Sequence, residues 1–294
     1  MGTLTGLRRQ TADSVVLVEV DERFDWQGRQ IAWGRAGTGP AVVFCHGTPF
    51  SSQIWEPFAA PLSRDFSVYL WDMPGYGKSS KHPGQPVDFG TQADAFAALL
   101  AHWRLDRPHV IAHDFGGAVS LRTHLVVGVG YASLMLVDVV AIPPSGSPFF
   151  RFVHDNPGLL GQLPGYIHQA IVRTYIQDAS HRGLRDDTLD MLVQPWTANE
   201  GQQAFYRQIA DYDERFLREN EQRLANLTIP VRIIWGADDA WIPADRAHKL
   251  HGLIPQATLA LVPGAGHLIH YDTPASLMNE IRAWLDTRAS QSMS

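Results

Sequence analysis

The stretch "VIAHDFGG" at residues 110–117 puts a carboxylate, Asp114, directly after a short apolar run and just before two glycines. One interpretation is structural, because Asp is a favoured residue at the N-terminal cap of a helix. The other is chemical, because a carboxylate is already ionised at neutral pH and can attack a carbon atom without a base. Attack on an ester or an amide would give a reactive anhydride, whereas attack on a saturated carbon gives a stable alkyl ester. Asp114 is therefore a candidate nucleophile for displacement at saturated carbon.

Short apolar runs, of the kind found in strands that are buried on both faces, recur along the chain. They occupy residues 41–45, 67–71, 109–113, 133–139, 230–235 and 258–262. Residues 91–105, between two of these runs, carry apolar side chains at helical spacing. Strands that alternate with helices predict an α/β fold with a mostly parallel sheet and helices on both faces. A hairpin of two further strands, 14–20 and 29–35, with Gly28 in its turn, is expected before them.

Residues 140–228 interrupt this alternation. They hold no strand-like run, but stretches such as "GYIHQAIVRTYI" and "GQQAFYRQIADYDERFLREN" have helical character. We therefore expect a helical cap, residues 140–228, inserted after the sixth strand, between the two parts of an α/β core at residues 1–139 and 229–294. A last helix is expected near residues 274–286, followed by a disordered tail at 288–294.

Composition and charge narrow the choice of partners. The chain of 294 residues is 45% hydrophobic and 18% charged, which is typical of a globular protein. Its net charge of -6 and the lack of a basic block argue against a nucleic-acid partner. The single cysteine, Cys45, excludes an intramolecular disulfide and favours a reducing compartment. Because no signal peptide and no membrane span are recognisable, we expect a cytoplasmic protein without a membrane partner.

Polar or glycine-rich loops follow the predicted strands, at the sheet edge where open α/β folds bind their ligands. Three of them read "HGTP" at 46–49, "GADD" at 236–239 and "GAGHLIH" at 264–270. Together with "AHDFGG" at 112–117, these motifs resemble the oxyanion loop, acid loop, histidine loop and nucleophile elbow of the α/β-hydrolase fold. The resemblance covers nearly the whole chain and places the insertion where such folds carry a cap. It indicates the branch with an Asp nucleophile, which includes epoxide hydrolases and haloalkane dehalogenases.

The resemblance implies a catalytic triad of Asp114 as nucleophile, His267 as base and Asp239 as the acid that supports the histidine. Asp138, at the end of the sixth strand, remains a second candidate for the acid, because some dehalogenases place their acid there. His270 stands three residues after His267, and such a pair can suggest a metal site. No cysteine or third histidine with ligand spacing lies nearby, so no metal and no other cofactor are expected.

The resemblance also implies two half-reactions. Asp114 forms an alkyl ester, and a water molecule activated by His267 then attacks the carbonyl carbon of that ester. The backbone N–H groups of Thr48 and Phe115 are expected to form the oxyanion hole. Haloalkane dehalogenases hold the departing halide with aromatic or amide N–H groups, which neither Phe115 nor Thr48 carries. Phe115 also replaces the arginine of fluoroacetate-type dehalogenases, so simple dehalogenation is disfavoured.

Opening an epoxide produces a basic oxygen that needs a proton donor. Epoxide hydrolases often carry an aromatic–Tyr–Arg sequence in the cap, and "FYR" at 205–207 matches it and nominates Tyr206. The other interpretation of Tyr206 is a packing residue on an amphipathic helix. Tyr166 and Tyr175 are candidates for a second tyrosine, and Tyr166, nearer the start of the cap, is assigned to substrate binding.

These motifs favour hydrolysis of an epoxide to a diol, on a small apolar to amphipathic organic substrate. Haloalkane dehalogenation is the first alternative, and "HGTPFSSQIWEP" and "GYGKSSK" resemble dehalogenase sequences. Another hydrolase or lyase reaction at the same site is the second alternative. A ligand-binding protein on a degenerate hydrolase fold would be expected to lack a triad residue, and none is missing. The sequence leaves the oligomeric state open.

Overall fold

The computed structural model describes residues 18–292, with side chains as far as residue 288. In this part of the chain, eight strands form one sheet in the order β1-β2-β4-β3-β5-β6-β7-β8. The ladders β1–β2 and β2–β4 are antiparallel and the others are parallel. The strands are β1 (Glu22–Trp26), β2 (Arg29–Ala36), β3 (Ala41–Cys45), β4 (Ser67–Trp71), β5 (His109–His113), β6 (Ser133–Val137), β7 (Val231–Gly236) and β8 (Thr258–Val262).

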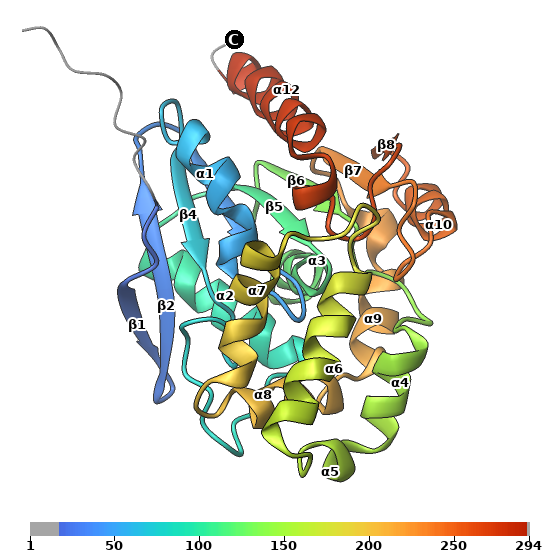
Figure 1. Ribbon diagram of the computed structural model, residues 1–294. Coiled ribbons are helices and arrows are strands. Elements are labelled where there is room, and N and C mark those ends of the chain that lie inside the picture. Colours follow the sequence, from blue (N-terminus) through green and yellow to red (C-terminus); the bar gives the residue numbers. More distant parts are fainter. Residues whose placement is uncertain (1–17, 293–294) are drawn as a thin grey trace, which may run out of the picture.

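The parallel strands at the centre of the sheet are buried along almost their whole length. Every residue of β5 and β6 is buried, and so is every residue of β3 after Ala41. Continuous apolar runs suit such strands, because helices cover both faces of the sheet (Figure 1). The predicted mostly parallel sheet is confirmed, and its carboxyl-end loops lie together on one edge.

Helices fill the connections between the strands (Figure 1). In the core they are α1 (Glu56–Leu62), α2 (Phe89–His102), α3 (Phe115–Arg122), α10 (Asp245–Leu253), α11 (Ile269–Asp272) and α12 (Pro274–Ser292). Short turns of other helical types are η1 (Ser52–Trp55), η2 (Thr123–Val127) and η3 (Leu224–Asn226). Asp88 caps α2 by accepting hydrogen bonds from the backbone N–H groups of Gly90 and Thr91.

The stretch between β6 and β7 contains helices and no strand, all of it within the described residues. Its helices are α4 (Pro148–Asp155), α5 (Pro157–Leu160), α6 (Gly165–Asp178), α7 (Asp186–Thr197), α8 (Gly201–Ala210) and α9 (Glu214–Glu221). They occupy the lower half of Figure 1, on the side of the molecule where β5 and β6 end. The helical insertion after the sixth strand is confirmed, while the division into core and cap at residues 139 and 228 stays a prediction.

The N-terminal hairpin differs from the prediction in its first strand. That strand is β1, residues 22–26, and not 14–20; residues 14–17 lie outside the described part and residues 18–20 are not in a strand. Gln27 and Gly28 have φ values of 53° and 73°, so they form the two-residue turn with positive φ that suits a hairpin. The turn pairs Trp26 with Arg29 and thereby sets the register of the whole ladder.

The C-terminal helix is longer than expected. It continues to Ser292, so the disordered tail predicted for residues 288–294 is wrong for residues 288–292, and 293–294 lie outside the described part. No glycine or proline follows Pro274 to interrupt the helix. Within residues 18–292, no helix is both long enough and apolar enough to cross a membrane.

Candidate active site

Asp114 lies in the turn between β5 and α3, at the carboxyl edge of the sheet. Its backbone has φ 48° and ψ -119°, which is a strained conformation for a residue other than glycine. Small neighbours allow the chain to pack closely around this turn. A Cβ atom at Gly47 would lie 2.3 Å from Asp114 Cβ, and one at Gly116 would lie 2.6 Å from the backbone oxygens of Cys45 and His46. The glycines therefore permit the tight turn that presents the Asp114 side chain.

Asp114 is 3% exposed, and its carboxylate makes no hydrogen bond to the first turn of α3. Oδ1 instead accepts a hydrogen bond from the backbone N–H of Thr48 at 2.7 Å. Oδ2 lies 3.4 Å from Nε2 of His267. Although Asp114 occupies the N-cap position, its side chain does not cap the helix, so the capping interpretation is wrong. One oxygen faces a backbone donor and the other faces a histidine, as ester formation and its later hydrolysis require.

His267 is linked to Asp239 on its other side. Nδ1 of His267 lies 2.9 Å from Asp239 Oδ2, and both side chains are fully buried. The second oxygen of Asp239 accepts hydrogen bonds from the backbone N–H groups of Trp241 and Ile242, each at 2.8 Å. These bonds fix the carboxylate, which accepts the proton on Nδ1 and leaves Nε2 of the histidine facing Asp114.

Asp138, the second candidate for the acid, makes its hydrogen bond elsewhere. Its Oδ1 accepts a hydrogen bond from the backbone N–H of Gly236 at 2.7 Å, and its Oδ2 has no partner among the described residues. Burial, and then the charge of Asp239, hold the pKa of Asp138 well above its usual value. The hydrogen bond to the His267 ring comes from Asp239, and that of Asp138 goes to Gly236. The geometry therefore favours Asp239 as the supporting acid.

Two carboxylates determine the charge of His267. Burial alone lowers the pKa of the imidazole, but the charges and hydrogen bonds of Asp239 and Asp114 outweigh it and raise the pKa well above its usual value. The two carboxyl groups thus favour the protonated form of the histidine. Esterification of Asp114 would remove one negative charge and lower this pKa, so His267 would become a base at the step that needs one.

Tyr206 is buried in α8, but it does not line the cavity beside Asp114. Its hydroxyl lies 3.0 Å from Nδ1 of His168, whose Nε2 lies 2.9 Å from the carbonyl oxygen of Trp196. Because a carbonyl only accepts, His168 carries its proton on Nε2, and Tyr206 donates its own proton to Nδ1. The position of Tyr206 therefore does not support the predicted role as proton donor to a substrate.

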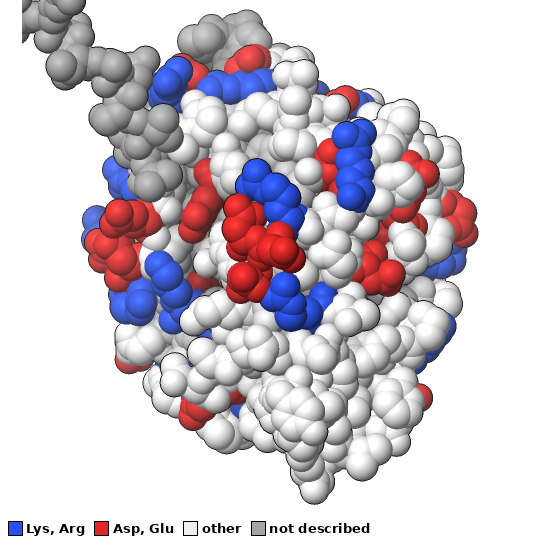
Figure 2. All heavy atoms as spheres, in the orientation of Figure 1, with Lys and Arg blue, Asp and Glu red and all other residues white. Residues whose placement is uncertain are grey.

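Tyr166 lies at the start of α6 and is 73% exposed, so its assignment to substrate binding is not supported either. Phe152 and Leu159, on α4 and α5, are also exposed, and Figure 2 shows few charged side chains at this lower end of the molecule. Tyr166 belongs to this outer surface because it points away from the buried face of α6, which consists of His168, Val172, Tyr175 and Ile176.

A cavity of about 30 Å³ adjoins the Asp114 carboxylate, with room for little more than a water molecule. Thr48 and Phe115, the predicted oxyanion-hole residues, both line it. Helices α4 and α6 contribute Phe150 and Tyr175, and Trp241 follows the acid loop. The structure thus brings Asp114, Asp239, His267, Thr48 and Phe115 together, and it adds Tyr175, which the sequence nominated only as an alternative.

The Tyr175 hydroxyl can act as a donor in this cavity. Burial raises the pKa of Tyr175, and a hydrogen bond with Ser147 acts in the opposite direction, so the phenol is protonated at neutral pH. Ser147 Oγ already accepts a hydrogen bond from the backbone N–H of Phe150 at 3.2 Å. Its own hydrogen can therefore go to Tyr175 Oη, which leaves the phenolic proton for another acceptor.

Trp241 was missed by the sequence reasoning, although it stands only two residues after Asp239. Its ring stacks on Tyr175 with 4.2 Å between the ring centres and on His267 with 5.1 Å. Its indole N–H points elsewhere and donates to Asp178 Oδ2 at 3.2 Å. Proximity to the predicted acid was the one signal that could have identified this residue.

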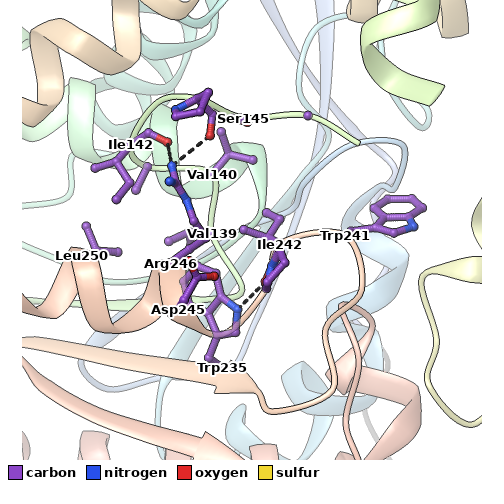
Figure 3. Close-up of a pocket in the computed structure, with 14 residues that line it drawn as sticks. Val139, Val140, Ile142, Ser145, Trp235, Trp241, Ile242, Asp245, Arg246 and Leu250 are labelled. Carbon is purple, nitrogen blue, oxygen red and sulfur yellow. Dashed lines mark hydrogen bonds between the residues drawn. The ribbon is translucent and has the colours of Figure 1, made fainter. Parts of the chain in front are cut away.

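A larger cavity, of about 260 Å³, adjoins the first one, between the loop after β6 and the segment from β7 to α10. Figure 3 shows Arg246 reaching from α10 to the loop after β6, where Nη2 donates to the carbonyl oxygens of Ile142 and Pro144 at 2.6 and 2.9 Å. The walls are mainly apolar. The two cavities share five lining residues, Val140, Ser145, Gly146, Trp241 and Ile242.

His270 lies behind the site in a mostly aromatic environment. Its ring packs edge-on against Trp55 at 4.3 Å and against His113 at 4.7 Å between ring centres. Neither ring nitrogen of His270 has a hydrogen-bond partner among the described residues. Across the same residues, no group of three or more His, Cys, Asp or Glu side chains lies close enough to hold a metal ion.

Known proteins resemble this chain over both the sheet and the helical insertion. The family model described as the alpha/beta hydrolase family matches residues 42–280. A solved alpha/beta hydrolase fold protein from Burkholderia ambifaria is 43% identical, with a TM-score of 0.88 over 91% of this chain and 99% of that chain. An uncharacterized protein of Mycobacterium tuberculosis is 27% identical over 88% of this chain and 79% of its own length. Haloalkane dehalogenase 2 of Mycobacterium tuberculosis is 26% identical over 85% of this chain and 90% of that protein.

Proposed function

The chain belongs to the alpha/beta hydrolase family, and from that premise we propose that it hydrolyses an epoxide to a diol through an ester on Asp114. The observation that carries the proposal is the environment of the carboxylate. Oδ1 accepts a hydrogen bond from Thr48 N–H, and Oδ2 faces Nε2 of His267 at 3.4 Å. A carboxylate held in this way suits attack on a saturated carbon, and its ester is then exposed to a water molecule activated by the histidine.

In the first step, a carboxylate oxygen of Asp114 attacks a ring carbon, and the bond between that carbon and the ring oxygen breaks. The ring oxygen keeps the electron pair and takes a proton. We assign the proton donor to Tyr175, because this residue lines the same cavity. The same role was predicted for Tyr206, whose proton is held by His168. The tyrosinate can then take up the proton of His267, whose pKa falls once Asp114 is esterified.

In the second step, the neutral His267 removes a proton from a water molecule that attacks Cγ of the Asp114 ester. The resulting oxyanion accepts hydrogen bonds from the N–H groups of Thr48 and Phe115. The bond between Cγ and the substrate oxygen then breaks, and that oxygen takes the proton of the new hydroxyl group. This releases the diol and restores the Asp114 carboxylate, the protonated His267 and the neutral Tyr175.

The cavities support a small substrate with an apolar part. The space beside Asp114, about 30 Å³, admits little more than the reacting atoms. We assign the remainder of the substrate to the adjoining cavity of about 260 Å³. Its apolar walls include Val139, Trp235 and Leu250, and they favour a hydrocarbon group over a charged one.

Haloalkane dehalogenation is the second candidate, and it is favoured by the likeness to haloalkane dehalogenase 2 of Mycobacterium tuberculosis. The N–H groups near the site argue against it. The indole of Trp241 donates to Asp178, and that of Trp196 donates to the carbonyl oxygen of Pro49. The hydroxyl group of Thr48 is bonded to Gln208, so the hydroxyl-bearing residues of the cavity lining that can donate are Ser145, Ser147 and Tyr175, and hydroxyl donors suit an alkoxide better than a halide.

The test traps the ester. His267→Gln, which lacks the base, is incubated with a panel of small epoxides and haloalkanes and analysed by intact-protein mass spectrometry. An epoxide should add its whole mass to a peptide containing Asp114, and wild type should release the diol. Asp114→Ala should gain no mass. A mass increase from haloalkanes alone, with halide release, would establish the second candidate, and an adduct on another residue would refute the nucleophile.

Tyr175→Phe tests the leaving-group assignment. General-acid assistance is typically worth about 100- to 10,000-fold, so formation of the ester should slow within that range in a rapid-quench experiment. Hydrolysis of a preformed ester should change much less. Tyr206→Phe is the matched control for ester formation, because Tyr206 does not line the cavity. A slower alkylation in Tyr206→Phe than in Tyr175→Phe would return the role to Tyr206.

A further inference from the structure

Two side chains of the helical insertion contact the loop that carries the oxyanion donor. Gln208 of α8 accepts a hydrogen bond from Thr48 Oγ1 at 2.5 Å, and a second one from Tyr76 Oη at 3.0 Å. Trp196 of α7 donates its indole N–H to the carbonyl oxygen of Pro49 at 2.6 Å. Helices α7 and α8 are neighbours in the fold (Figure 1). Two consecutive residues of the oxyanion loop are thus held by side chains more than 140 positions later in the chain.

The contacts are formed out of water. Thr48, Tyr76, Trp196 and Gln208 are each no more than 5% exposed. A hydrogen bond in such surroundings is electrostatically stronger than one at the surface. If the Gln208 amide is turned round, Nε2 donates to the same two hydroxyl groups, because a hydroxyl both donates and accepts.

A further chain of hydrogen bonds supports Trp196. Tyr206 donates to His168, and His168 donates to the carbonyl oxygen of Trp196. Both bonds lie within the helical insertion, on α6, α7 and α8. Tyr206 therefore helps to hold the indole that reaches Pro49, and the "FYR" motif contributes to the support of the oxyanion loop rather than to the cavity.

We propose that Gln208 and Trp196 are positioning residues that align the Thr48 N–H with Asp114, so that the oxyanion hole is complete only while α7 and α8 are docked on the core. The proposal extends the proposed function, since the oxyanion in question belongs to the Asp114 ester. The proposal links opening of the closed cavity beside Asp114 to the state of the oxyanion hole. Movement of α7 and α8 that admits a substrate also releases Thr48, and re-docking restores the donor before the ester is hydrolysed.

The two half-reactions respond differently to this donor. During alkylation the negative charge leaves Asp114, so a donor to Oδ1 does not stabilise the transition state. During ester hydrolysis negative charge develops on that oxygen, and the Thr48 N–H stabilises it. Loss of Gln208 or Trp196 should therefore slow hydrolysis selectively, whereas a general loss of stability would affect both steps.

The experiment compares Gln208→Met, which keeps the length of the side chain, and Trp196→Phe, which is smaller but stays aromatic, with Gln203→Met. Both test variants lose the hydrogen bond to the oxyanion loop. Gln203 is an exposed residue of the same helix, α8, and bonds only to Gly161 within the insertion. Loss of a complete oxyanion donor typically slows turnover about 100- to 1,000-fold. We expect misalignment to slow hydrolysis about 10- to 100-fold, with alkylation within about two-fold of wild type and Gln203→Met unchanged.

A double-mutant cycle and an exchange measurement complete the test. Thr48→Val removes Oγ1 but keeps the N–H, so its effect should not add to that of Gln208→Met. Hydrogen exchange without substrate, read at the Thr48 amide, should be faster in Gln208→Met and Trp196→Phe but not in Gln203→Met. Equal slowing of both half-reactions, additive effects or unchanged exchange would each overturn the proposal. If wild type forms no ester, the proposed function fails, and the exchange result alone decides this inference.

Discussion

At the level of single residues, the site depends on charges that compensate one another. Asp114 and Asp239 lie on opposite sides of His267, and all three side chains are buried. Such an arrangement is stable only while each charge has its partner. In the mechanism that we propose, esterification of Asp114 would change that balance and lower the pKa of His267, which would then act as a base.

The first prediction tests this coupling without any substrate. In Asp114→Asn the negative charge next to Nε2 is lost, as it is in the ester, and the pKa of His267 should fall relative to wild type. The titration is followed by NMR of the imidazole resonances. Asp94→Asn, a change on the surface of α2, is the control and should leave the titration unchanged. An unaltered pKa in Asp114→Asn would mean that Asp114 does not decide the charge of the base.

The second prediction separates the two candidate acids. Asp239→Asn removes the charge that supports His267, so ester hydrolysis should slow strongly and the ester should accumulate in rapid-quench samples. Asp138→Asn should have little effect on either half-reaction, because the hydrogen bond of Asp138 goes to Gly236 N–H and an amide oxygen can still accept it. The reverse pattern, with a defect in Asp138→Asn alone, would assign the acid to β6.

At the level of elements, the first turn of α3 and the loop after β6 are packed too closely for any added atom. Gly117 of α3 faces Val139, and a Cβ atom at this glycine would lie 2.4 Å from Val139 Cβ. The carbonyl oxygen of Asp114 accepts hydrogen bonds from the N–H groups of Gly117 and Val140. Helix α3 and this loop therefore hold the nucleophile turn between them.

The third prediction follows from this packing. Gly117→Ala should destabilise the fold by about 1–3 kcal/mol, the usual range for overpacking, because Val139 is β-branched and its Cβ cannot rotate away. Gly252→Ala is the matched control, since that helical glycine has no atom within 4 Å of an added Cβ. It should be neutral or stabilise by up to about 1 kcal/mol. Urea unfolding measures both, and equal midpoints would contradict the packing argument.

At the level of the whole molecule, several buried histidines link stability to pH. Burial lowers the pKa of His46, His113 and His270, the last to about 3. Where the folded-state pKa lies below the unfolded value of about 6.5, the unfolded chain binds the proton first. Stability is then complete above about pH 6.5 and is lost as the pH falls towards the folded-state pKa. The raised pKa of His267 acts in the opposite direction.

The fourth prediction isolates one of these groups. His270→Phe places an apolar ring among Trp55, Phe58 and His113 and removes a group that costs stability in acid. Because pH 5 lies about 1.5 units below the unfolded pKa, the wild type should lose about 2 kcal/mol more than the variant between pH 7 and pH 5. Urea midpoints at the two pH values provide the comparison. Parallel losses in both proteins would show that His270 is not the group that titrates.

Local patterns in the sequence were sufficient to predict the sheet and the helical insertion. They were also sufficient to locate the loops that carry Asp114, Asp239 and His267. Buried parallel strands require continuous apolar runs, and the residues after each run must lie at the same edge of the sheet. From these two rules alone, the loops that carry the three residues could be predicted to lie close together, although no contact between them was known. The first strand was misplaced because a hairpin turn, Gln27–Gly28, and not the longest apolar run, set its register.

Only the tertiary structure decided which cap residues face the nucleophile. Tyr166, Tyr175 and Tyr206 all stand on helices, but only Tyr175 lines the cavity, Tyr166 is at the surface and Tyr206 binds His168. The direction of each side chain depends on how its helix is rotated against the core, which no local pattern specifies. The contact between Gln208 and Thr48 joins residues 160 positions apart. This contact forms because helix α8 packs against the loop after β3. The sequence of neither segment alone specifies that packing.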